Sequence, residues 1–173
     1  MAIVNLDKVL SGANGNLESV VAFDSGTTLS KNYANGLFVD IDGFVKDKKS
    51  DWVGRAGEAK YGLVSTDGTK DTVMLHAPEV QYDEKLFMRD FKNEEGKIVR
   101  GYRLQRGDIL TMTDQAITVS SHEALAVGNT LTVKNGRLAK EDSPKAGQLT
   151  LKVIADAGNT LDRVEKAWTL QVQ

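Results

Sequence analysis

Short stretches of alternating apolar and polar residues recur along the chain. Residues 37–42 follow an Asn35-Gly36 turn signal and alternate in this way, and the same period returns over residues 149–153 and 168–172. A period of two places successive side chains on opposite faces of a strand. These stretches therefore predict strands that each have one buried face, whereas a sustained helical period of 3.6 residues is almost missing.

Two turn signals predict how some of these strands are joined. Asn135-Gly136 lies between extended flanks and favours a two-residue turn, because both central residues of such a turn take positive φ. Asp67-Gly68 separates the strand-like runs 59–66 and 71–77, which the sequence predicts to pair as a second hairpin. The stretch 161–168 fits either a short helix or the start of a strand, and both alternatives stay open.

The composition agrees with a chain built of strands. The chain has 17 Val, 6 Ile and 13 Thr. Gly is frequent, with 16 residues, whereas Pro occurs twice. Branching at Cβ suits a pleated strand better than a helix, and glycine suits tight turns. We predict a mainly β fold: a small β-sandwich or barrel with glycine-turn hairpins and an extended N-terminal arm.

The arm is expected to span residues 1–16, ahead of a β domain over residues 17–173. Sub-lobes over 17–78 and 79–173 are left open as a subdivision of that domain. The arm ends in a polar, glycine-containing run, and its apolar side chains are Ile3, Val4, Leu6, Val9 and Leu10. One interpretation is an arm that buries these side chains on another subunit. The alternatives are a frayed end or a short helix over residues 4–10 folded onto its own domain.

Charge and cysteine content exclude several classes of protein. Lys and Arg total 22 against 24 Asp and Glu, a net charge of −2, and this balance argues against a nucleic-acid partner. The chain has no Cys, which excludes disulfides, cysteine-ligated zinc, iron–sulfur clusters and a thiol nucleophile. No apolar run approaches the roughly 20 residues that cross a bilayer, so no membrane partner is expected.

Candidate catalytic and metal-binding residues are few. His76 and His122 are the only histidines, and no Gly-x-Ser-x-Gly motif presents a serine to either of them. Asp40-Ile41-Asp42-Gly43 begins like a calcium loop, but the twelfth position from Asp40 is Asp51 where that loop requires Glu. We therefore expect no enzyme activity, no metal and no cofactor, and we place Asp40 and Asp42 on the solvated face of a strand.

A run of basic residues follows residue 88 with two aromatic residues among them. Acidic residues interrupt this run, so it predicts a solvated or protein-facing polar surface in place of an RNA platform. The basic residues are Arg89, Lys92, Lys97, Arg100, Arg103 and Arg106.

Three segments carry a resemblance to a known family. Residues 106–113 (RGDILTMT), 126–133 (AVGNTLTV) and 135–138 (NGRL) follow the order Gly-Asp, apolar strand, Val-Gly, apolar strand, glycine hairpin. This pattern resembles the small capsid-decorating (head cement) proteins of tailed bacteriophages, and it covers roughly residues 100–173 together with the arm.

The resemblance implies a structural virion protein with no catalytic residues. Such a protein is made in the host cytoplasm, binds the major capsid protein on the exterior of the assembled shell, and stabilises it. It implies self-association as a dimer or trimer, with neither a nucleic-acid nor a membrane partner. The arm side chains would then be buried against the capsid or a sister subunit, and deleting residues 1–12 would leave a folded monomer that no longer binds shells.

Two other functions are compatible with a β-rich chain. One is a different virion component (a tail tube, head fibre or baseplate protein), for which residues 79–104 would hold a long hairpin. The other is a β-sandwich carbohydrate-binding module, which needs exposed aromatic side chains. The candidates for that role are Tyr33, Trp52, Tyr61, Tyr82, Tyr102 and Trp168.

Overall fold

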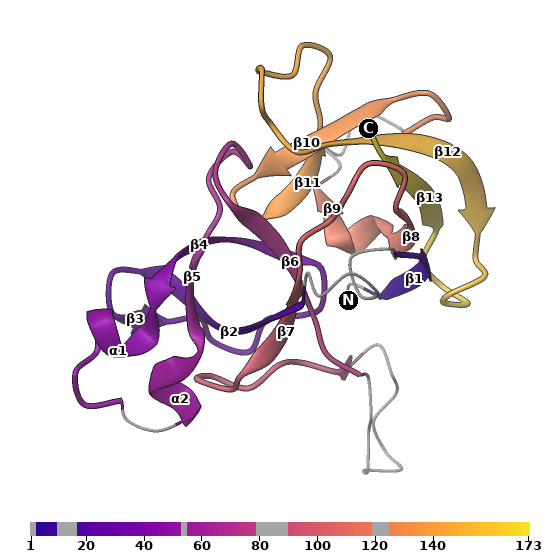
Figure 1. Ribbon diagram of the computed structural model, residues 1–173. Coiled ribbons are helices and arrows are strands. Elements are labelled where there is room, and N and C mark those ends of the chain that lie inside the picture. The colour runs from indigo at the N-terminus through magenta and orange to yellow at the C-terminus, as the bar shows by residue number, and fades with distance from the viewer. Residues whose placement is uncertain (1–2, 10–16, 53–54, 79–89, 119–124) are drawn as a thin grey trace.

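Two β units pack against each other in the computed structural model shown in Figure 1. The structure describes residues 3–9, 17–52, 55–78, 90–118 and 125–173. One unit is a closed five-stranded barrel and the other is a seven-stranded sheet. The predicted mainly β fold class is therefore confirmed.

The barrel is drawn in indigo to magenta in the lower left of Figure 1. Its strands follow the order β2-β5-β4-β6-β7, and β7 returns to pair with β2. The pairing of β2 with β5 is parallel and the others are antiparallel, while the short β3 extends β2. The strands are β2 (Leu17–Ser25), β3 (Thr28–Leu29), β4 (Leu37–Phe44), β5 (Lys60–Val64), β6 (Thr72–His76) and β7 (Val99–Tyr102).

Two glycines make room inside this barrel. A Cβ atom at Gly62 would lie 2.6 Å from a methyl group of Val20, and a Cβ atom at Gly101 would lie 2.9 Å from a methyl group of Val73. Both valines are fully buried in the interior cluster of the barrel, together with Val39. The barrel is therefore too narrow at these two positions for any side chain.

The second unit is a sheet with strand order β1-β8-β13-β12-β10-β11-β9. Its pairings are antiparallel except between β11 and β9, and the N-terminal strand joins strands from the C-terminal part of the chain. The strands are β1 (Val4–Lys8), β8 (Ile109–Thr113), β9 (Ile117–Thr118), β10 (Thr130–Lys134), β11 (Arg137–Lys140), β12 (Thr150–Gly158) and β13 (Ala167–Val172).

The helices in the described part of the chain are single turns. These are α1 (Val45–Lys48), α2 (Arg55–Glu58) and the 3₁₀ turn η3 (Asp114–Ala116). Within the described ranges, no helix has the length and apolar character needed to cross a membrane.

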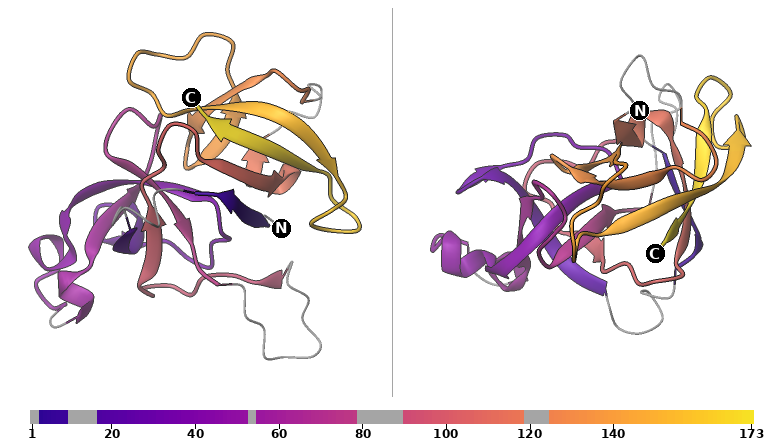
Figure 2. Two further views of the ribbon diagram at one scale, coloured as in Figure 1. Left: turned by 45° about the vertical axis from the view of Figure 1, so that its right-hand side comes forward. Right: turned by 90° about the horizontal axis from the view of Figure 1, so that it is seen from above.

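One hydrophobic core joins the two units. Phe38 and Met74 of the barrel belong to the same buried cluster as Leu110 and Leu151 of the sheet. The β10–β11 hairpin also docks on β4, because the Phe38 amide donates to the Gly136 carbonyl at 2.9 Å. Figure 2 shows this contact between the units from two sides. Since β7 closes the barrel, a boundary after residue 78 would cut through the first unit.

The hairpin predicted around Asp67-Gly68 is wrong. Both of its strands exist as β5 and β6, but β4 lies between them and pairs with each. The turn instead packs on the second unit, where the Leu149 amide donates to the Gly68 carbonyl at 2.9 Å. A local turn signal cannot predict this contact, because the sheet residues involved lie some 80 residues later in the chain.

Several other predictions are confirmed. Asn135 and Gly136 take positive φ angles of 50° and 76° and join β10 to β11. The alternating stretches 37–42 and 168–172 lie in β4 and β13, and the stretch 149–153 lies in β12 except for its first residue. Residues 161–166 form bends and irregular backbone, so the helix is not present there, and the strand β13 begins only at Ala167.

Candidate interaction surfaces

The predicted arm residues are the first candidate surface, and the structure places them in the chain's own sheet. Ile3 and Val4 are 8% and 4% exposed. The Thr113 amide donates to the Ile3 carbonyl, and the Ile3 amide donates to Thr113 Oγ1, each at 3.0 Å. Strand β1 then continues along β8, with Val4 opposite Met112 and Asn5 opposite Thr111.

The expectation of a separate arm over residues 1–16 is therefore corrected for residues 3–9, and the rest of the expected arm lies outside the described residues. Leu6 and Val9 are partly buried against the same core, and Leu10 lies outside the described residues. Residues 4–8 form a strand where one alternative had a helix, because their apolar side chains complete the edge of the sheet beside β8. These side chains pack within their own chain. We therefore expect deletion of residues 1–12 to expose the core.

His76 connects the barrel to this N-terminal strand. Its Nε2 lies 3.3 Å from the Val4 carbonyl, and its ring meets Tyr102 edge to face at 6.0 Å between centroids. Burial lowers the pKa of His76 below its ordinary value. The surroundings of His76 are those of a structural side chain, and His122 lies outside the described residues.

The prediction that Asp40 and Asp42 lie on a solvated face is confirmed for Asp42 and wrong for Asp40. Asp42 is exposed and pairs with Lys48 at 2.8 Å, which lowers the pKa of Asp42. Asp40 is only 7% exposed and accepts a 2.7 Å hydrogen bond from Thr72 Oγ1. The two carboxylates thus have separate partners, and no cluster of three metal-ligating side chains occurs in the part of the chain that the structure describes.

Arg103 forms a charged clip at the seam of the barrel. Its Nε and Nη2 each donate to a carboxylate oxygen of Asp71 at 2.8 Å, and its Nη1 donates to Glu18 at 3.2 Å. Hydrogen bonding from the guanidinium lowers the pKa of Asp71. Glu18 lies on β2 and Arg103 directly follows β7, so the clip ties together the two strands that close the barrel.

The aromatic side chains proposed for carbohydrate binding lie mostly in the interior. Tyr61, Tyr102 and Trp168 are at most 9% exposed, Tyr33 and Trp52 are half-buried, and Tyr82 lies outside the described residues. The Tyr33 hydroxyl is buried and has no hydrogen-bond partner among the residues that the structure describes. This arrangement weighs against a carbohydrate-binding platform made of these rings.

A mixed cluster of lysines and aromatic rings covers the outer end of the barrel. The ammonium groups of Lys46 and Lys60 lie 5.5 and 4.2 Å from the centre of the exposed Phe44 ring. Lys49 approaches Trp52 in the same way at 5.4 Å. Residues 44–60 hold five basic and three acidic residues, so the cluster forms a surface of mixed charge.

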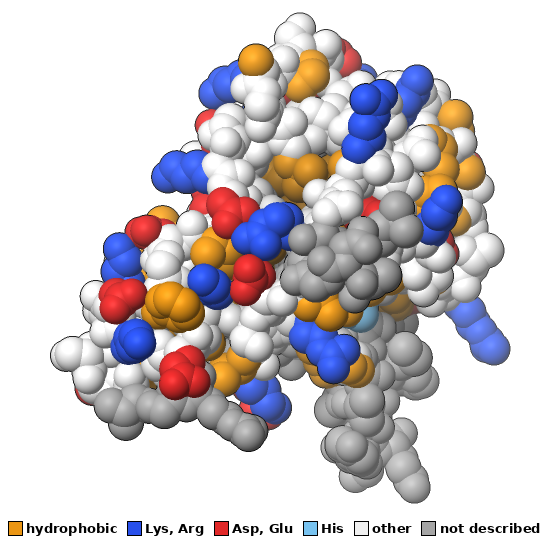
Figure 3. Space-filling view, viewed as in Figure 1, with side chains coloured by type: hydrophobic (Ala, Val, Ile, Leu, Met, Phe, Trp, Pro, Cys, Tyr) orange, Lys and Arg blue, Asp and Glu red, His pale blue; other side chains and the backbone are white. Residues whose placement is uncertain are grey.

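Exposed apolar side chains lie along the outer part of the second unit. We define the β12 patch as Val127 and Ile154, which are 60% and 38% exposed. Val164, which is 74% exposed, lies in the segment between β12 and β13. The Gly128 amide donates to the Val153 carbonyl at 2.8 Å. Val127 and Ile154 are the chain neighbours of these two hydrogen-bonded residues. Figure 3 shows hydrophobic side chains at the surface over β12. Exposed apolar side chains that group together are typical of protein-binding surfaces.

This patch was missed from the sequence, although one signal for it exists. Val153 and Ile154 are adjacent apolar residues in a strand, and two neighbours on one strand face opposite sides. Val153 is fully buried, so Ile154 must face outward. A β-bulge between Val153 and Ala155 accompanies this position.

The open edges of the sheet are less suited to binding another strand. The β1 edge carries a bulge between Asn5 and Lys8, and Asp7 and Lys8 are exposed on it. At the opposite edge, β9 has two residues. Bulges, charges and short length are the features that protect sheet edges from strand addition.

Comparisons with known proteins identify no relative. No family model matches the chain, and neither the curated proteins nor the solved structures contain a match.

Proposed function

We propose that this chain is a structural virion protein that binds the exterior of an assembled tailed-phage capsid and stabilises the shell. The observation that carries the proposal is where the three resembling segments lie. Residues 106–113 lead into β8, residues 126–133 into β10, and residues 135–138 form the turn into β11. These strands belong to one sheet, so the resemblance coincides with a structural unit.

The β12 patch is the contact surface that we propose for this function. It belongs to the same sheet, and its side chains are already solvent-exposed in the folded chain. Burial of an apolar side chain at an interface contributes about 25 cal/mol for each Å² removed from water. Many copies on one shell would add such contributions over the whole particle.

The scaffold fits an adhesive role. The barrel has no free edge among its five strands, and its core continues into the sheet that bears the patch. A rigid body of this kind needs little ordering when it binds. Self-association as a dimer or trimer remains a prediction.

Co-sedimentation with undecorated heads of the phage that encodes the chain tests the proposal. We expect the intact protein to sediment with the heads, and the double variant Val127→Thr, Ile154→Thr to bind about tenfold more weakly or less. The matched control is Leu17→Thr, Ile98→Thr, which changes two similarly exposed apolar residues on the barrel unit. Heads that leave the intact protein in the supernatant would contradict the proposal.

A further inference from the structure

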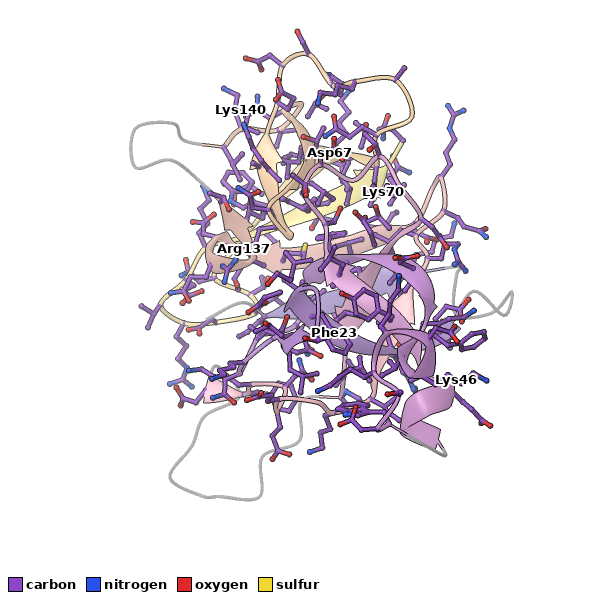
Figure 4. All side chains as sticks on the ribbon, turned by 90° about the vertical axis from the view of Figure 1, so that its left-hand side faces the viewer. Phe23, Lys46, Asp67, Lys70, Arg137 and Lys140 are labelled. Atoms are coloured by element: carbon purple, nitrogen blue, oxygen red, sulfur yellow. The ribbon has the colours of Figure 1, made fainter. Side chains whose placement is uncertain are left out.

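We infer that a polar cleft between the barrel and the sheet binds an oxyanion, a carboxylate or phosphate group. The cleft encloses about 340 Å³. Its barrel wall comes from the β5–β6 loop and the segment after β7, and its sheet wall from the residues before β12 and at the end of β13. Figure 4 shows Asp67 and Lys70 at this boundary between the two units.

Hydrogen bonds to the backbone hold both walls of the cleft in place. The β5–β6 loop is held to the sheet wall by the Gln148 side chain, which donates to the Asp67 carbonyl at 2.5 Å. On the other side, the Gly107 amide donates to the Val172 carbonyl at 2.9 Å and the Gln173 amide to the Thr150 carbonyl at 3.0 Å. A ligand would therefore meet a formed site, and its binding energy would not be spent on ordering loops.

The charged side chains that line the cleft are mostly cationic. Lys70, Arg103 and Arg106 face one carboxylate side chain, Asp71. Arg103 pairs with both Asp71 and Glu18, so the three cations and these two carboxylates leave one positive charge in excess. Lys70 and Arg106, which form no ion pair with either carboxylate, are both exposed. This local excess stands against a net charge of −2 for the whole chain. Cations that gather on one side of a cleft raise the local concentration of an anion there.

Hydrogen-bond donors accompany the charges. The contacts of Arg103 with Asp71 and Glu18 use three of the five N–H groups of a guanidinium and hold it in place. The ammonium of Lys70 and the guanidinium of Arg106 supply further donors from two segments of the barrel wall. Ligand sites in proteins commonly span about 300–1,000 Å³. The volume of this cleft therefore suits a small anion such as pyrophosphate, or an acidic peptide segment of a few residues.

This inference stands independently of capsid binding. Two sources supply the same oxyanion chemistry: an acidic segment of a partner protein, or a free phosphate compound. We would titrate the ¹⁵N-labelled protein with a blocked tetraglutamate peptide and, separately, with pyrophosphate, and follow the backbone amides by NMR. We expect saturable shifts at Lys70, Arg106 and Thr150 with at least one probe, and the probe that binds more tightly identifies the source.

Matched charge variants make the assignment specific. We expect Lys70→Gln, Arg106→Gln to weaken binding about tenfold or more, because it removes two charged donors. The control Lys46→Gln, Lys49→Gln makes the same change in net charge at the outer end of the barrel, and we expect less than about a twofold effect. Added salt at about 1 M, which shortens the screening length to about 3 Å, should weaken binding by the intact protein.

A form with a neutral Gly-Ser extension after Gln173 is titrated in parallel. Because the extension moves any terminal carboxylate away from the cleft wall, we expect equal or tighter binding. Absence of saturable shifts with both probes would overturn the inference. Equal weakening in the cleft variant and in the control would also overturn it, since that result indicates a general charge effect. A well-dispersed spectrum of each variant verifies that it is folded.

Discussion

The barrel and the sheet solve the problem of strand edges in different ways. The barrel takes its strands from residues 17–102 and closes on itself through β2 and β7. The sheet combines β1, from the start of the chain, with strands from residues 109–172, and it stays open at β1 and β9. Closure leaves the barrel few ways to bind a partner, whereas the open sheet carries the β12 patch.

A shared core makes these two units depend on each other. Phe38 lies on a barrel strand but packs in the cluster that includes the sheet, whereas Phe23 packs with Tyr61 at the outer end of the barrel. We therefore expect substitutions of exposed residues on the sheet to leave the fold intact, whereas substitutions at the joint between the units should destabilise it.

The largest expected effect is therefore at the joint. We expect Phe38→Ala to lower the free energy of unfolding by about 3–5 kcal/mol, because it opens a cavity between the units. Trp52 reports on the barrel and Trp168 on the sheet, so single-tryptophan variants can follow each unit in urea. We expect both probes to show one midpoint. If the two single-tryptophan variants without the Phe38 substitution gave different midpoints, the units would unfold independently.

The next effect concerns the narrow interior of the barrel. We expect Gly62→Ala to lower the free energy of unfolding by about 1–3 kcal/mol, because its Cβ would approach Val20 and Val39 to within 2.8 Å or less. Gly107→Ala is the comparison, because a Cβ there would meet no atom within 4 Å, although its φ of +94° carries backbone strain. Urea denaturation measures both variants. A smaller loss at Gly62 than at Gly107 would contradict a tightly packed barrel.

The N-terminal strand gives a third, smaller effect. We expect Val4→Ala to lower the free energy of unfolding by about 2 kcal/mol through loss of buried methyl groups. The pair Asn5→Cys, Thr111→Cys then tests which chain the strand belongs to, because these residues face each other across β1 and β8 and the chain has no other Cys. We expect an oxidised monomer on a non-reducing gel. A disulfide-linked dimer would show that β1 pairs with a sister subunit.

The smallest effect is a pH dependence through His76. Burial holds the pKa of His76 below its ordinary value of 6.5, so the unfolded chain binds the proton more readily. Stability is therefore present above pH 6.5 and falls as the pH drops below that value toward the pKa of the folded state. We expect His76→Gln to flatten this part of the curve in urea titrations between pH 7 and pH 5. His122→Gln is the matched control, and equal flattening in both variants would contradict the assignment to His76.

The sequence predicted local structure better than the pairing of distant strands. The Asn135-Gly136 turn is confirmed because its positive φ angles are a local requirement of the two residues. The pairing of β5 and β6 was wrong because β4, which comes earlier in the chain, lies between them. Asp40 was placed on a solvated face, but β4 is covered on both sides from Phe38 to Asp40, and alternation cannot reveal this.

The candidate surfaces were harder to predict for the same reason. Ile3 and Val4 were expected to be buried against a capsid or a sister subunit, but they are buried in this chain, where the partner strand of β1 lies about a hundred residues away. The cleft combines Lys70 with Arg106 and Thr150, which come from three separate parts of the sequence. Only the outward position of Ile154 had a local signal, in its apolar neighbour Val153.

Electron cryomicroscopy of the purified chain mixed with undecorated heads tests the proposed function most directly. We predict added density on the outside of the shell that fits the barrel and the sheet, with the β12 side turned toward the capsid lattice. Bare shells at saturating protein concentration, or polymerisation of the chain into tubes, would contradict it.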